Sequence, residues 1–228
     1  MTIFKYSLKR GLNPLSLLVN GFVPIALMFI PVFWEGNRPG GFGFLSFAMM
    51  SGAFIISMTL LTDKVDGAIV RILSAPVTMR QYLVENLMAF MVPLTVQVGI
   101  VTILGVILHD WNFTLAIAVF LCYTMLNLST VAMAFAWHCL FKSKEGSAGA
   151  FGMVLTAASM LSGVMMPVEF LPGIIQYIGA VFPMFWMARG LNAVLDYGVM
   201  NMTFVIGIAA MVLFSIAFLL YGGKRRIV

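Results

Sequence analysis

Long apolar runs without a charged side chain alternate with short polar segments along the chain. A helix needs about 20 predominantly apolar residues to cross a bilayer, and six of these runs meet or approach that length. The pattern therefore predicts an all-α polytopic membrane protein with transmembrane helices at residues 15–34, 42–61, 87–108, 113–140, 147–166 and 202–221.

The N-terminal segment, residues 1–12, has a different pattern. Phe4, Leu8 and Leu12 recur every four residues, and basic side chains lie between them. This spacing predicts an amphipathic helix in the membrane interface. The alternative is a basic flank without fixed structure. Asn13-Pro14 then favours a helix start, because asparagine can cap the helix and the missing N–H of proline leaves no bond unmade.

Residues 167–190 contain a further apolar run that is interrupted by prolines, so no uninterrupted helix can cross the bilayer there. Cytoplasmic loops of membrane proteins are enriched in Lys and Arg. With six spans and both termini cytoplasmic, every Lys and Arg except Arg38 and Arg189 lies on the cytoplasmic side. We therefore expect residues 167–190 to form a broken, re-entrant hairpin at the outer face rather than a seventh span.

The longest polar interruption is the segment of residues 62–86 between the second and third spans. Its first half places four apolar residues on one helical face: Val65, Ile69, Ile72 and Leu73. This predicts a helix at the membrane surface, which Pro76 ends because proline disfavours helical angles in the residue before it. A second short helix, residues 79–85, is expected to lead into the third span.

Composition excludes an ordinary soluble domain, since 62% of the residues are apolar and only 9% are charged, against about 25% charged in soluble domains. The net charge of +5 does not indicate nucleic-acid binding, because the basic residues are scattered among loops. Two cysteines in one apolar run indicate neither a disulfide framework nor a metal site. We expect one membrane domain, residues 1–228.

The sequence shows no energy source that could move a molecule across the membrane against a gradient. No phosphate-binding loop of the form G-x-x-x-x-G-K-[ST] is present, and the spans are nearly free of ionisable side chains. His109 and His138 are single residues, and the 19 methionines lack a repeated close spacing, so no metal is predicted. Any driving energy must therefore come from a partner, and residues 62–86 are the natural contact for it.

Two motifs resemble ABC-2 type transporter permeases. Residues 62–83 contain DGAIVRILSAPVTMRQYL, which is similar to the stretch after the second span of that family, where an acidic residue and glycine precede a helix, an arginine and a serine-x-proline turn. Residues 162–192 resemble the outer hairpin after the family's fifth span. The family usually has threonine after the glycine, where this chain has Ala68.

The resemblance implies a permease subunit that pairs with a second, identical or different, permease subunit in a bacterial plasma membrane. Each would dock on a separate ABC ATPase subunit that holds ATP and Mg²⁺, and this chain would bind no cofactor. The implied coupling residues are Asp66, Gly67, Arg71, Leu73 and Pro76. The implied residues of the outer hairpin are Pro167, Glu169, Pro172, Pro183 and Arg189. The fifth predicted span, rich in small residues, favours close packing with another helix or subunit.

These features favour an exporter of a hydrophobic or amphipathic substrate, such as a drug, a peptide antibiotic or a lipid-linked compound. A membrane scaffold or sensor that binds an ATPase without transporting is the alternative. The opening Asp66-Gly67 with Arg71 also approaches the D-G-x-x-A-R motif of CDP-alcohol phosphotransferases, but the later glycine and two further aspartates of that family are missing. Glu169 is expected either to pair with Arg189 or to lie among the outer headgroups.

Overall fold

The computed structural model describes residues 2–36, 39–74, 77–164 and 173–224, and every regular element within these ranges is a helix. The elements in chain order are α1 (Thr2–Gly11), α2 (Pro14–Leu17), the π-helix η1 (Leu18–Phe22), α3 (Val23–Met28), the 3₁₀-helix η2 (Pro31–Trp34), α4 (Gly41–Val65), α5 (Ala68–Leu73), α6 (Met79–His109), α7 (Phe113–His138), α8 (Lys144–Leu161), α9 (Gly173–Gly179), α10 (Pro183–Tyr197) and α11 (Met202–Lys224).

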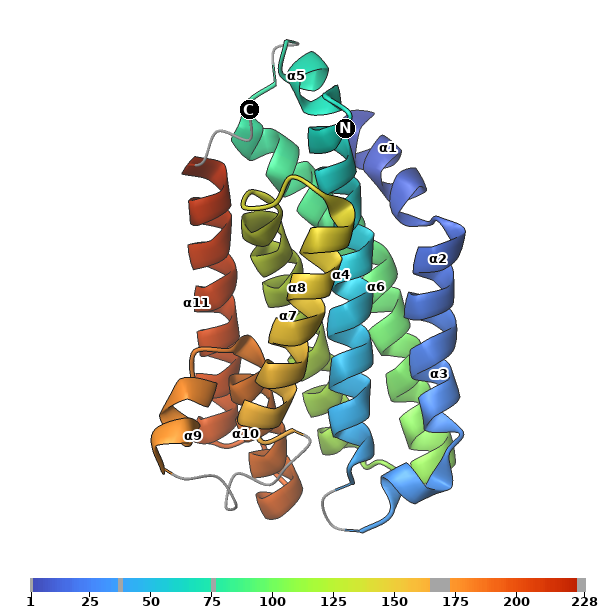
Figure 1. Cartoon of the computed structure of the whole chain (residues 1–228). Coiled ribbons are helices and arrows are strands. Elements are labelled where there is room, and N and C mark those ends of the chain that lie inside the picture. Colours follow the sequence, from blue (N-terminus) through green and yellow to red (C-terminus); the bar gives the residue numbers. More distant parts are fainter. Residues whose placement is uncertain (1, 37–38, 75–76, 165–172, 225–228) are drawn as a thin grey trace.

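The long helices form one bundle. In Figure 1, α4, α6, α7, α8 and α11 run along its long axis together with the column of α2 and α3. The helices α1 and α5 lie at one end, where α11 also finishes, and α9 and α10 lie toward the other. Helix α7 is central, because it packs against α4, α6, α10 and α11. We refer to these ends as the α5 end and the opposite end.

Four described helices are long and apolar enough to cross a membrane, namely Gly41–Val65, Met79–His109, Phe113–His138 and Met202–Gly222. The stretches Ile3–Gly11 and Pro14–Met28 meet the same conditions together, but a 66° bend separates them. The chain is therefore a multi-pass membrane protein. Helix α8, in the region of the predicted fifth span, is not among these helices, and the count of six spans stays a prediction.

The region of the first predicted span, residues 15–34, consists of α2, η1, α3 and η2, with a short non-helical break between α3 and η2. Asn13 caps its start as predicted, because its Oδ1 accepts from the Ser16 N–H at 2.8 Å. The helix then widens into a π-turn before Pro24, which lacks a backbone donor, and α3 ends at Met28. Asn20 lies in this π-turn, with its Nδ2 donating to the Ser16 carbonyl oxygen at 3.0 Å. An inserted side-chain amide of this kind disturbs the backbone ladder.

The helical pattern of residues 62–86 also differs from the prediction. Helix α4 continues to Val65, and Gly67, with φ of 67°, separates it from the six-residue α5. Glycine adopts this left-handed conformation without steric cost and so ends α4. The single helix expected from Val65 to Leu73 is therefore divided: Val65 is the last residue of α4, and Ala68–Leu73 forms α5. The expected short helix at 79–85 is the start of the continuous α6, which Thr78 caps by accepting from the Gln81 N–H at 3.2 Å.

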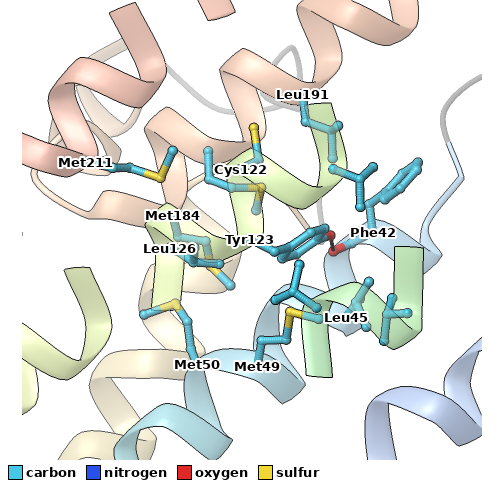
Figure 2. Packing of buried hydrophobic residues seen from close by; sticks show 14 of the residues in the cluster. Phe42, Leu45, Met49, Met50, Cys122, Tyr123, Leu126, Met184, Leu191 and Met211 are labelled. Carbon is cyan, nitrogen blue, oxygen red and sulfur yellow. Dashed lines mark hydrogen bonds between the residues drawn. The ribbon is translucent and has the colours of Figure 1, made fainter. Parts of the chain in front are cut away.

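Two clusters of buried side chains form the core. One lies toward the opposite end and joins α4, α7, α10 and α11 (Figure 2). In it, Tyr123 donates its hydroxyl hydrogen to the Phe42 carbonyl oxygen at 2.8 Å. Methionines fill much of the remaining space, as expected for flexible side chains in irregular packing: Met28, Met49, Met50, Met184, Met187 and Met211. The second cluster lies toward the α5 end and includes Ile69, Tyr82 and Phe90.

The predicted outer hairpin is described only in part. Pro167, Glu169 and Pro172 lie outside the described residues. Beyond them, α9 is a short helix and α10 runs past residue 190 to Tyr197, packing against α7 and α11. Pro183 occupies the start of α10, where its missing N–H leaves no bond unmade. Arg189 is exposed on α10.

Candidate functional site

The predicted coupling residues lie at the tip of the bundle, where α5 projects beyond the ends of the long helices (Figure 1). Ile69 is 2% exposed and anchors α5 in the second core cluster. Asp66 and Arg71 are exposed, and Val70 is 56% exposed. Helix α5 therefore holds to the bundle by one face and presents charged and apolar side chains on the other. Of the remaining coupling residues, Pro76 lies outside the described residues, as does the side chain of Leu73.

A partly buried ion pair lies directly beneath this tip. Asp63, on the last turn of α4, is 5% exposed. Its carboxylate accepts from Arg10 Nη1 of α1 and from the Tyr82 hydroxyl of α6, the latter at 2.7 Å. Partial burial opposes the charge of Arg10, but the hydrogen bond and negative charge of Asp63 outweigh it and raise the pKa of Arg10. Arg10 stays charged, so the pair joins α1, α4 and α6.

The neighbouring residue joins α4 to α7. Lys64 Nζ donates to the carbonyl oxygens of His138, Cys139 and Phe141 at 3.2, 2.9 and 3.0 Å. The last carbonyls of a helix have no partner within it and carry partial negative charge, so an ammonium group there is stabilising. Together, Asp63 and Lys64 connect the end of α4 to three other helices. We call Arg10, Asp63, Lys64 and Tyr82 the anchor network.

Sequence reasoning missed the anchor network. The expected surface helix placed Asp63 and Lys64 on polar faces away from the membrane, whereas the continuation of α4 turns Asp63 inward. The available signal was a pair of adjacent opposite charges at the end of an apolar run. Such charges must find partners when the helix that carries them packs into a bundle.

A cavity lies between α2, α4 and α8. Its volume is about 440 Å³, within the range of about 300–1,000 Å³ typical of small-molecule sites. The rings of Phe54 and Phe151 stack at its edge with centroids 3.8 Å apart. Its described lining is mostly apolar, with four polar side chains and no charged one: Asn13, Ser51, Thr59 and Thr62. Such a cavity can hold an apolar molecule that carries hydroxyl or amide groups.

Helix α8 closes one side of this cavity and is fixed at its start by His138. The ring nitrogens of His138 lie 3.1 Å from Ser57 Oγ of α4 and 3.2 Å from Ser147 Oγ of α8. The outward face of α8 carries exposed small residues, including Gly149, Gly152 and Ala157. Small residues let two helix backbones approach closely, so this face suits contact with a further helix.

The long apolar helices of the bundle define an integral membrane protein. A family model described as an ABC-2 family transporter protein matches residues 40–223. The chain belongs to the ABC-2 transporter family, which confirms the resemblance inferred from its two motifs and replaces the phosphotransferase alternative. No curated protein matches the chain. Permeases of this family are the membrane components of transporters, are generally not catalytic themselves and normally work with an ABC ATPase subunit.

Proposed function

We propose that this chain is the permease subunit of an ATP-driven exporter that moves a hydrophobic or amphipathic molecule out of a bacterial cell. The observation that carries the proposal is the course of α4. This one helix lines the cavity from Phe47 to Thr62 and, in the next two residues, enters the anchor network beneath α5. A displacement of α5 by an ATPase subunit would therefore reach the cavity wall without crossing a flexible joint within α4.

Six spans with both termini cytoplasmic complete this proposal. The column of α2 and α3 is the first span, α8 is the fifth, and the α5 end faces the cytoplasm. Helix α8 has 18 residues, which at 1.5 Å each gives about 27 Å, close to the hydrocarbon thickness of about 30 Å. The exposed Arg71 and the basic side chains of α1 then lie on the cytoplasmic side, as the positive-inside rule requires.

A second permease subunit supplies the missing wall of the path. The small-residue face of α8 is the contact we propose for it, because this face is exposed and adjoins the cavity. The lining supports the proposed substrate class, because it offers aromatic rings and hydroxyl groups but no fixed charge among the described residues. Closure of the ATPase subunits would move α5, shift α2, α4 and α8 and open the path toward the hairpin of residues 167–190.

The test is purification of the tagged chain in mild detergent with mass spectrometry of the proteins that accompany it. We expect an ATPase subunit bearing a phosphate-binding loop. Arg71→Glu should abolish this association because it reverses an exposed charge on α5. Lys142→Glu reverses another exposed charge at the same end, in the connection from α7 to α8, and should retain the partner.

Transport by the reconstituted complex separates the exporter from the scaffold. Vesicles containing the chain and its ATPase should accumulate a fluorescent amphipathic dye on addition of ATP. Other amphipathic molecules that the transporter carries should reduce this accumulation. An ATPase that binds through α5 without any ATP-dependent movement of apolar or amphipathic molecules would support the scaffold or sensor. A chain that purifies alone in several detergents would overturn the docking assignment.

A further inference from the structure

Two amide side chains lie in the middle of the bundle without a hydrogen-bond partner among the described residues. Gln97 on α6 is 5% exposed, and Asn127 on α7 has no exposed surface. Neither the oxygen nor the nitrogen of either amide is hydrogen-bonded within the described chain. Burying such a group without a hydrogen bond is unfavourable, and nearly all buried polar groups in proteins have a partner. Both amides therefore require a donor and an acceptor from elsewhere.

Asn127 lies on the side of α7 that faces α4. Tyr123, one turn earlier, donates to the α4 residue Phe42, and His138, three turns later, contacts the α4 residue Ser57. Positions 123, 127, 134 and 138 share one helical face, because side chains three or four residues apart lie above one another. Asn127 thus faces α4 between two polar contacts, about one turn beyond Tyr123. Both contacts join residues 81 apart, which places Asn127 near the level of Ser46, about one turn of α4 before Met50. Figure 2 shows the α4 and α7 side chains of this part of the core.

Gln97 lies at nearly the same depth on the inward side of α6. Its helix carries a buried stripe at three- and four-residue spacing: Leu83, Leu87, Phe90, Leu94, Gln97 and Val101. Gln97 is 12 residues before the end of α6, and Asn127 is 14 residues after the start of α7. At 1.5 Å per residue, Gln97 lies about 18 Å and Asn127 about 21 Å along its helix from the opposite end of the bundle. Since α6 and α7 pack together as consecutive helices, the two amides lie in one layer of the bundle.

We propose that Gln97 and Asn127 form an internal hydration site that holds one or two water molecules between α4, α6 and α7. Water can donate to both amide oxygens and accept from both amide nitrogens, and buried water typically makes about three such bonds. The Oγ1 of Thr124, one turn before Asn127, also has no partner in the described chain and adds a hydroxyl to the same region. A bridging water keeps its bonds over a range of separations, so α6 can shift against α4 and α7.

A double-mutant cycle on the full chain tests whether the two amides share this site. Gln97→Leu and Asn127→Leu should each lower the Tm, by about 3 °C or more, because the remaining amide loses its bridge. The Tm of the double variant should fall by clearly less than the sum of the decreases in the two single variants. Thr102→Val and Thr130→Val form the matched control, since their hydroxyls donate to carbonyls of their own helices, and their effects should add. Additive effects of the two leucine substitutions, or a rise in Tm in the single variants, would overturn the shared site.

Radiolytic labelling separates bridging water from a direct bond between the amides. X-ray irradiation converts bound water to hydroxyl radicals in place, so Met50, only 1% exposed, should be oxidised in the native chain. This oxidation should be lost in the double leucine variant. Met211 on α11, with no exposed surface, is the control and should stay unmodified in both. Coupled amides with an unmodified Met50 would mean direct contact and would exclude the hydration site.

Discussion

The two ends of the bundle are held together by different kinds of interaction. At the α5 end, the charged side chains of the anchor network bind three helices to the last turn of α4. At the opposite end, Trp34 packs against three rings, with centroids 5.0 Å from His109, 5.2 Å from Phe42 and 5.5 Å from Trp111. We call Trp34, Phe42, His109 and Trp111 the aromatic cluster. It packs η2, which follows α3, against α4 and the end of α6.

This difference suits the proposed transport cycle. Charged hydrogen bonds are directional and depend on both partners, so helices joined by them are expected to move together. The aromatic cluster depends on shape, although two of its members also bind the end of α3. His109 Nε2 lies 2.9 Å from the Met28 carbonyl oxygen, and Trp34 Nε1 donates to the Leu27 carbonyl oxygen at 3.0 Å. In the proposed cycle, the α5 end would transmit a displacement of α5 to the other helices, and the aromatic cluster would hold the end of α3 in place.

The largest effect is expected from breaking the anchor network at Asp63. Asp63→Asn leaves the partly buried guanidinium of Arg10 without its counter-charge. Removing one member of a fully buried pair typically costs about 3–5 kcal/mol, which is the upper limit here because the Arg10 side chain is 26% exposed. We expect a large loss of thermal stability, measured by unfolding of the purified chain, and loss of ATP-driven transport. The exposed Asp66→Asn, three residues further on, is the control and should unfold like the native chain. Equal stability of the two variants would contradict the role of Asp63.

An intermediate effect is expected from the aromatic cluster at Gly105. A methyl group on Gly105 would lie 2.2 Å from the ring of Trp111, so Gly105→Ala forces that ring to move. Overpacking of this kind costs about 1–3 kcal/mol. Unfolding monitored by tryptophan fluorescence should show lower stability and a changed native spectrum, while the ATPase stays bound. Gly99→Ala, in the same helix with open space around it, should be neutral or slightly stabilising.

Much of this architecture follows from local patterns in the sequence. Apolar runs predict the long helices because each must bury its backbone bonds in the bilayer, and Asn13 predicts the start of α2 through its cap. The pairing of Arg10 with Asp63 could not be predicted in this way, since 53 residues separate them and only the packing of α1 against the bundle brings them together. The π-turn at Asn20 likewise depends on Gly52 of α4, whose carbonyl oxygen accepts from the Asn20 amide at 3.3 Å.

The candidate sites also include one part that the sequence could predict and one that it could not. Gly67 was singled out by its place after an acidic residue, and its left-handed conformation gives that choice a physical reason. The cavity could not be predicted, because its lining comes from α2, α4 and α8 and no short motif marks it. The hydroxyl groups that line the cavity belong to isolated Ser and Thr residues, and such residues are common in apolar helices without lining a cavity.

The smallest effect on stability, and the sharpest comparison of the two ends, is expected from a pair of glycines. Gly67 precedes α5 with φ of 67°, and Gly198 follows α10 at the opposite end with φ of 69°. Both have open space where a Cβ would lie, so Gly67→Ala and Gly198→Ala should each cost about 1 kcal/mol from backbone strain alone. Thermal unfolding should therefore change little and equally in the two variants.

The two alanine variants should differ in their association with the ATPase subunit, because only Gly67 sets the direction in which α5 leaves α4. We expect Gly67→Ala to weaken association with the ATPase subunit and Gly198→Ala to leave it intact, both measured by co-purification at equal expression. Asparagine tolerates the left-handed conformation better than alanine does, so Gly67→Asn should restore part of the association. If both alanine variants bind the ATPase equally well, the angle between α4 and α5 does not control docking, and the contact must depend on the exposed side chains of α5 alone.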